Sequence, residues 1–282
     1  MKRLLFIELQ KIWKNKASKV LTITYFVLLS FIALFASIKF NLGPIKFHLA
    51  EMGIFNFPYI WHFNTYIASI LKFFLAIVIV SMMANEYSYG TLKQNLIDGL
   101  SKKEFVISKF LTVVLLSFLS TIFVFIMSLI LGLSFSSYTE FAIICSDLEY
   151  LFAFFVKLLG FFSFCLFLGI FVKRSAFALG FLIVWFFVEK ITYGLLKYEI
   201  FGNEKGDDSF VDKIYQFFPL EAMSNLIIEP FTRLSVVKNI GSQIGVEGIV
   251  DYNVHFFNIV IVLLWTGIFM FLSFKILQKR DL

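Results

Sequence analysis

The chain has 282 residues, of which 60% are hydrophobic and 20% aromatic, with a net charge of +6 and a mean hydropathy of +0.87. Soluble globular proteins are about 45–50% apolar, so this composition excludes an ordinary water-exposed fold and indicates a membrane protein. The basic residues lie beside apolar stretches, where they set topology and contact membrane lipid, which argues against a nucleic-acid partner.

The first segment, residues 1–19, is too polar to cross a membrane and is predicted to form a basic amphipathic helix. Leu5, Leu9 and Ile12 share one helical face, while basic side chains cover the other. Such a helix is expected to lie in the inner membrane interface. Two roles remain open for it: an elbow helix that packs beside cytoplasmic machinery, or a simple topogenic anchor.

Six apolar stretches follow, each close to the length of about 20 residues that a helix needs to cross the hydrocarbon core. They show no alternation with a period of two, so they are predicted to be helices and not barrel strands. The expected spans are 20–38, 67–84, 110–133, 151–172, 176–196 and 255–275. The fold class is therefore an all-α polytopic membrane protein, with residues 1–282 forming one transmembrane domain.

The distribution of charge between the two sides predicts the orientation of the spans. One side carries fifteen basic and five acidic residues, and the other carries eight basic and thirteen acidic residues in longer loops. By the positive-inside rule both termini are expected in the cytoplasm. Residues 85–109 then form the main cytoplasmic loop, and residues 197–254 form the largest extracytoplasmic segment.

The remaining connections give two further expectations. The turn Lys173–Ser175 is so short that spans four and five are predicted to form a tight antiparallel hairpin. The aromatic loop before span two contains Phe55, Phe57 and Trp61, which is typical of an outer interface belt. In the large outer segment, Pro219 is expected to begin a short helix.

The cytoplasmic loop has the sequence pattern of a short helix followed by a glycine elbow. Thr91 is expected to cap the helix, and Leu92, Leu96 and Ile97 would form one apolar stripe along it. Gly99 occupies the position at which glycine commonly ends a helix. The next residues, Ser101–Glu104, match a capping box in which Glu104 would hold the start of a second helix.

This loop resembles the one between spans two and three of the ABC type-2 permeases. The matching residues are Glu86, Gly90-Thr91-Leu92, and Gly99-Leu100-Ser101-Lys102 followed by Glu104 and Lys109, with lysine at 102 where many members carry arginine. The resemblance implies that the loop is a coupling helix that contacts an ATP-binding cassette subunit through Glu86, Gly90, Thr91, Leu92, Leu96, Ile97, Gly99 and Glu104. The alternative is a well-capped loop that only connects two spans.

The same resemblance implies the rest of the expected assembly. A second permease copy, identical or paralogous, would face this one in a bacterial cytoplasmic membrane, with the export pathway between them. The chain itself would have no catalytic residues, metal site or cofactor, because ATP and magnesium bind to the partner subunit. For the outer segment the resemblance implies short helices that dip back into the membrane, although a lid over the bundle fits the sequence equally well.

Charged residues within the spans are rare and usually face the bundle interior or water. Lys157 and Glu189 lie at about 9 and 10 Å from the same membrane face, counted at about 1.5 Å per residue. They are therefore predicted to form an intramembrane ion pair. Two consequences stay open: the pair locks the helices together, or the two residues line the outer half of a substrate path.

Two other classes of function fit parts of the sequence. One is a membrane scaffold or accessory protein without transport activity. The other is a stand-alone secondary transporter, although the repeated or broken spans typical of that class are not apparent. If the chain transports, its apolar, phenylalanine-rich spans favour an amphiphilic or peptidic substrate.

Overall fold

The computed structural model describes residues 2–38, 40–42, 45–47, 53–200, 208–233 and 251–280. Six of the described helices are long and apolar enough to cross a membrane: α2 (Lys16–Ser37), α3 (Tyr59–Ser88), α5 (Lys102–Phe135), α7 (Glu149–Val172), α8 (Ser175–Leu195) and α12 (Phe256–Lys279). These helices confirm the prediction of an all-α, multi-pass membrane protein.

Shorter elements connect the spans. The short helices are α1 (Lys2–Lys14), α4 (Thr91–Ile97), α6 (Phe141–Ile144), α9 (Asp208–Tyr215) and α10 (Pro219–Ser224), with a π-helical turn at Leu196–Ile200 and a 3₁₀ turn at Phe231–Arg233. A small antiparallel hairpin pairs β1 (Phe40–Leu42) with β2 (Ile45–Phe47). Residues 201–207 and 234–250 of the predicted outer segment lie outside the described residues.

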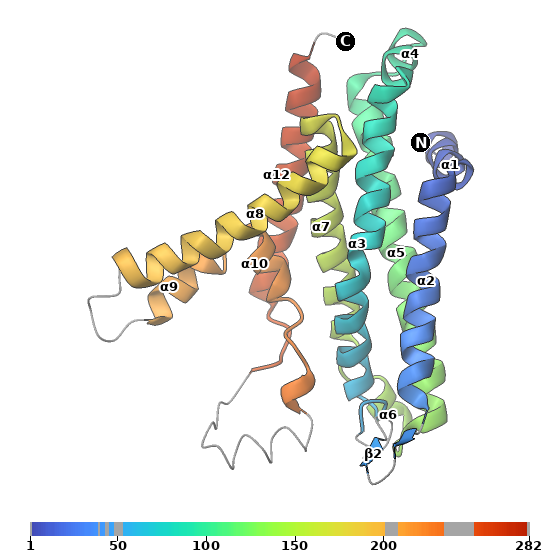
Figure 1. The fold of residues 1–282 in the computed structure, drawn as a ribbon, viewed down its shortest axis with the longest axis vertical. Coiled ribbons are helices and arrows are strands. Elements are labelled where there is room, and N and C mark those ends of the chain that lie inside the picture. The colour runs from blue at the N-terminus through green and yellow to red at the C-terminus, as the bar shows by residue number, and fades with distance from the viewer. Residues whose placement is uncertain are drawn as a thin grey trace.

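Helix α7 is the centre of the bundle and packs against α3, α5, α8 and α12 (Figure 1). In its most apolar stretch of 18 residues, 78% of the residues are buried. This agrees with the sequence of α7, which is apolar on all sides, because a helix of that kind is stable only where other helices or lipid surround it.

Both chain ends and α4 lie at one end of the bundle, and α6 and β2 lie at the other (Figure 1). Helices α3 and α5 have 30 and 34 residues. At about 1.5 Å per residue they are roughly 45 and 50 Å long, which exceeds a hydrocarbon core of about 30 Å. The two helices are therefore longer than a single crossing requires, and α4 joins them at one end of the bundle.

Helix α8 does not form the predicted tight hairpin with α7. The chain turns sharply at Lys173, which has a left-handed φ of 65°, and α8 then runs obliquely away from the bundle (Figure 1). Only 11% of its most apolar stretch is buried. The prediction was wrong because a short turn brings together only the two helix ends that it joins. The angle between the helices is set by the side chains that pack between them farther from the turn.

For three residues of the predicted aromatic belt the interpretation is wrong, because their rings are packed inside the chain, whereas Tyr59 in the same stretch is 45% exposed. Phe55, Phe57 and Trp61 are 2%, 1% and 0% exposed. The Trp61 indole donates a hydrogen bond of 3.0 Å to the Ile144 carbonyl and stacks on Phe125. A satisfied N–H allows the large ring to be buried, so this aromatic group fills the outer end of the bundle core.

Helix α10 reaches the middle of the bundle, although it belongs to the outer segment. Pro219 occupies the first turn, as predicted, and α10 packs on α7, α8 and α12. A Cβ atom built on Gly160, near the midpoint of α7, would lie 3.2 Å from Met223 Cε and 2.6 Å from Val262 Cγ1. The missing side chain at Gly160 thus leaves room for α10 and α12.

Substitution Gly160→Val should destabilise the chain by about 1–3 kcal/mol, because it forces extra volume into a closed contact. The measurement is the melting temperature of the purified protein in detergent. Gly180→Val on α8 is the matched control, since no described atom lies within 4 Å of a Cβ built there. Equal melting temperatures for the two variants would contradict the described position of α10.

Candidate coupling site

The loop at residues 85–109, predicted to be cytoplasmic, folds into a compact unit whose turns follow from its two glycines. Gly90 precedes α4 with φ +66°, and Gly99 follows it with φ +97°, values that glycine adopts without strain. After α4, the amide of Gly99 donates to the Leu96 carbonyl and that of Leu100 donates to the Asn95 carbonyl. This is a Schellman ending, so the predicted helix-ending role of Gly99 is confirmed.

The predicted capping box at the start of α5 is also present. The Ser101 hydroxyl accepts a hydrogen bond from the Glu104 amide at 3.2 Å, and the Glu104 carboxylate accepts one from the Ser101 amide at 3.0 Å. Reciprocal bonds of this kind satisfy two amides that a helix start would otherwise leave unpaired. Glu104 therefore holds the second helix of the loop, as expected.

The two faces of α4 have different roles. Leu92 is 2% exposed and Leu96 packs on the core, whereas Ile97 is 75% exposed. The predicted apolar stripe is thus too wide by one residue, because Ile97 points away from the bundle. Thr91 does not cap the helix as predicted; Gly90 holds that position, and the Thr91 hydroxyl donates to Glu86.

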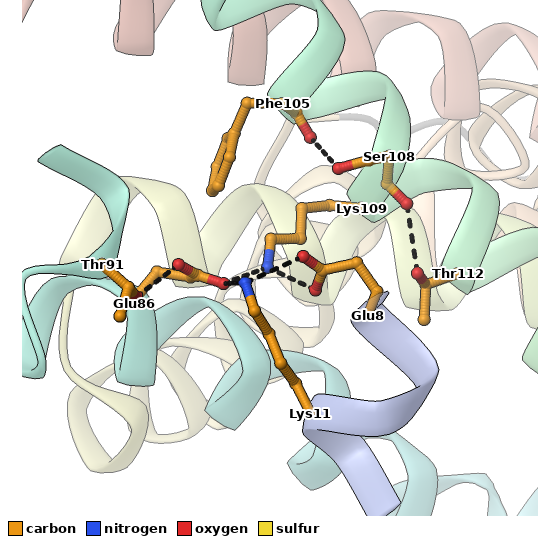
Figure 2. Close-up of polar contacts among 8 residues, drawn as sticks. All are labelled: Glu8, Lys11, Glu86, Thr91, Phe105, Ser108, Lys109 and Thr112. Atoms are coloured by element: carbon orange, nitrogen blue, oxygen red, sulfur yellow. Dashed lines mark hydrogen bonds and ion pairs between the residues drawn. The ribbon is translucent and has the colours of Figure 1, made fainter. Parts of the chain in front are cut away.

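A buried ionic network lies beneath α4 (Figure 2). The Lys109 ammonium contacts Glu8 Oε2 and Glu86 Oε1, each at 2.5 Å, while Lys11 lies 2.7 Å from Glu86 Oε1 and 3.2 Å from Glu8 Oε1. On its other side, Glu86 accepts a bond of 2.5 Å from Thr91. These five residues join α1, α3, α4 and α5, and we call them the coupling network.

The charges of the coupling network balance. Lys109, Glu86 and Glu8 are 0%, 2% and 5% exposed, so each would be costly to bury without its partners. Burial lowers the pKa of Lys11, but its hydrogen bond to Glu86 and the nearby carboxylate charges outweigh that effect and raise the pKa above its ordinary value. Lys11 therefore stays charged at neutral pH, and two cations face two carboxylates.

The C-terminal end of α12 is tied to the same end of the bundle. The Arg280 guanidinium donates to the Tyr87 hydroxyl at 2.9 Å and to the carbonyls of Ile170 and Phe171 at 2.5 and 2.7 Å. Lys102 of α5 donates to the Arg280 carbonyl at 2.9 Å. A cation at the C-terminal ends of α7 and α12 satisfies carbonyls that lack helical partners.

The predicted ion pair between Lys157 and Glu189 is not formed in this structure. The Lys157 ammonium donates to the Ile227 carbonyl at 3.3 Å. The Glu189 carboxylate accepts bonds from the Trp185 indole and from the amides of Leu220 and Glu221, at 2.7, 3.1 and 3.2 Å. The divergence of α8 separates the two charges, although both line one cavity.

Sequence reasoning missed two residues that the structure makes important. Glu8 was not singled out, although a lone acid between the apolar residues Leu5 and Leu9 was a visible signal of a buried pair. Lys72, one of the eight basic residues that the charge count places on the outer side, lies near the middle of α3 because that helix begins at Tyr59, before the predicted span.

Comparison with known proteins agrees with this architecture. No curated protein matches the chain. The model of a family described as ABC-2 family transporter protein matches residues 4–282, which include most of α1, the whole loop at residues 85–109 and α12. Because this match runs through almost the whole chain, the protein belongs to the ABC-2 family of transporter proteins, and its six-helix bundle is a transport permease.

Proposed function

We propose that this chain is the membrane-spanning subunit of an ATP-binding cassette exporter of a bacterial cytoplasmic membrane. In this proposal a second permease copy or a paralogue completes the pathway, and separate subunits bind ATP and magnesium. The observation that carries the proposal is the outward surface formed by Lys93 and Ile97 of α4 together with Tyr89, which follows α3, all of them exposed at the end of the bundle where α4 lies.

The outward face of α4 has the chemistry of a protein contact. Tyr89 and Ile97 are 74% and 75% exposed, and Lys93 lies between them in the sequence. Protein interfaces place apolar and aromatic residues at their centres, surrounded by polar groups. Because this end of the bundle extends beyond the membrane, lipid does not cover these side chains, and a protein partner would.

The coupling network supplies a way for a contact at α4 to move the spans. Glu86 and Lys109 connect α4 to α3 and α5, and Glu8 connects both to α1. Tightly packed groups transmit displacement because protein interiors have low compressibility. Closure of the ATP-binding subunits would therefore shift α4, α1 and the ends of α3 and α5 as one unit.

The proposal is tested by site-specific crosslinking in the native host. A photoreactive amino acid replaces Gln94, which is exposed on α4, and the tagged chain is purified in mild detergent. The expected result is a crosslink to an ATP-binding subunit and ATPase activity in the purified complex. The matched control is the same amino acid at Tyr138, which is exposed at the opposite end of the bundle and should give no such crosslink.

A purified chain with neither an ATP-binding partner nor ATPase activity would contradict the proposal. That result would favour a scaffold or a secondary transporter. Substrate flux driven by an ion gradient in liposomes that contain only this chain would then identify the secondary transporter.

A further inference from the structure

A partly open cavity of about 440 Å³ lies between α3, α7, α8 and α10 at the middle of the bundle. Its volume is within the range of about 300–1,000 Å³ that is usual for ligand pockets. Phe73, Phe161 and Phe186 form much of its apolar wall, and Lys72 and Lys157 add two cations. An apolar cavity with a few charged groups at membrane depth is a candidate ligand site by default.

The two lysines of this cavity have no carboxylate partner among the described residues. Lys157 is 4% exposed, and the hydrogen bond of its ammonium is to the Ile227 carbonyl. Lys72 lies with its ammonium 4.4 Å from the centre of the Phe161 ring. A carbonyl and an aromatic face stabilise a cation, but neither neutralises its charge.

The carboxylates that line the cavity are already occupied. Glu189 accepts hydrogen bonds from the Trp185 indole and from two amides at the start of α10. Glu221 is paired with Lys190 at 3.1 Å. Neither acid forms an ion pair with Lys72 or Lys157, so these two side chains lie on one wall of the cavity without a contacting carboxylate.

Tyr215 supplies a third polar group of the cavity. Its buried hydroxyl makes no hydrogen bond of good geometry within the described part of the chain, and the Lys190 ammonium lies nearby, 5.3 Å from the centre of the Tyr215 ring. Buried polar groups are nearly always satisfied, so such a group calls for a partner that the chain itself does not supply. An anionic oxygen would satisfy both the hydroxyl and the ammonium groups.

From this arrangement we propose that the cavity binds an amphiphile with an anionic phosphate or carboxylate headgroup. The headgroup lies against Lys72 and Lys157 and accepts a hydrogen bond from Tyr215. The hydrocarbon chain lies along the phenylalanine wall and the exposed apolar side of α8, where Ile183 is 55% exposed. The binding of this ligand does not depend on the proposed exporter function. Only the further step, that the bound ligand is also the transported substrate, rests on the proposed function.

The test compares two detergent-like ligands with the same hydrocarbon chain, one with an anionic phosphate headgroup and one in which an added choline makes the headgroup zwitterionic. Tetradecyl phosphate and tetradecylphosphocholine are titrated into the purified chain in lipid nanodiscs, and affinity is measured by calorimetry. The wild-type chain should bind the anionic ligand at least about tenfold more tightly, since one charge-assisted hydrogen bond accounts for that much. Inorganic phosphate, which lacks the apolar chain, should bind much more weakly than tetradecyl phosphate.

Variants at the cavity test its role directly. The double variant K72M/K157M should lose the preference for the anionic ligand, while the charge-preserving variant K72R/K157R should keep it and so exclude a general loss of folding. Lys190→Met is the matched control, because Lys190 lines the same cavity but is neutralised by Glu221. Equal binding of both ligands, or an unchanged preference in K72M/K157M, would overturn the proposal.

A second arm separates two sources of the ligand. The permease is reconstituted with its ATP-binding subunit, and ATP-dependent movement of labelled tetradecyl phosphate across the bilayer is followed. If the wild-type complex moves the labelled ligand and the K72M/K157M complex does not, the cavity binds a transported amphiphile. Binding without movement supports a resident anionic lipid at the same site, and the absence of an ATP-binding subunit would contradict the exporter function while leaving the binding result intact.

Discussion

Replacement of Lys109 by methionine is expected to be the most damaging single change in this protein. Lys109 is fully buried and contacts Glu8 and Glu86 at 2.5 Å. Without it, Lys11 alone would face two buried carboxylates, and breaking a buried pair in this way costs about 3–5 kcal/mol. The melting temperature of the purified chain should fall by roughly 10 °C, and the ATPase activity of any complex should fall with it.

Two further variants show whether charge is the cause. Lys103→Met removes an exposed lysine from the same helix and should leave the melting temperature nearly unchanged. The double variant E8Q/K109M restores charge balance, because Lys11 then faces one carboxylate, and it should recover part of the lost stability. A double variant that is less stable than Lys109→Met would show that hydrogen-bond geometry, and not net charge, dominates the coupling network.

The second large effect is expected at the outward face of α4. Ile97→Asp places a charge at the centre of the proposed contact with the ATP-binding subunit. Because Ile97 is 75% exposed, stability should change by less than about 0.5 kcal/mol. Loss of a central apolar contact at an interface costs about 2 kcal/mol or more, so affinity for the ATP-binding subunit should fall at least about thirtyfold.

This prediction is checked by measuring how much ATP-binding subunit co-purifies and how stable the variant is. Tyr138→Asp is the matched control, since it adds the same charge to an exposed position at the opposite end of the bundle. If the Ile97→Asp variant still co-purifies with a normal amount of the ATP-binding subunit, α4 is not the docking surface. A lower melting temperature with Ile97→Asp would instead show that Ile97 contributes to packing.

The cytoplasmic loop shows how far local sequence signals reach. The hydrogen bonds that end α4 near Gly99 and the Ser101–Glu104 capping box join residues that are at most five positions apart. The sequence therefore predicts both features, and both are present. The role of Thr91 was mistaken because its hydroxyl has a choice between a local amide and the distant carboxylate of Glu86. As a cap the hydroxyl would accept from the amide, whereas here it donates to the carboxylate, and only the packing of α3 against α4 decides between these two partners.

The same limit applies to charges within the membrane. The sequence marked Lys157 and Glu189 as intramembrane residues but paired them wrongly, because it could not give the direction of α8. Glu189 instead holds the first turn of α10, and Lys157 lies beside Lys72 in one cavity. A pairing between residues of different helices depends on helix crossing angles, which are set by contacts far apart in the chain.

Hydropathy and short-range patterns in the sequence were enough to predict the membrane class, the six spans, their order, and the helix end and capping box of the loop at residues 85–109. These properties depend on hydropathy and on hydrogen bonds between near neighbours, which the chain carries at every position. Only the tertiary structure decided that Glu8, Lys11, Glu86 and Lys109 meet, and that Lys72 and Lys157 share a cavity. Contacts between distant segments depend on how whole helices pack, and that is a property of the assembled bundle.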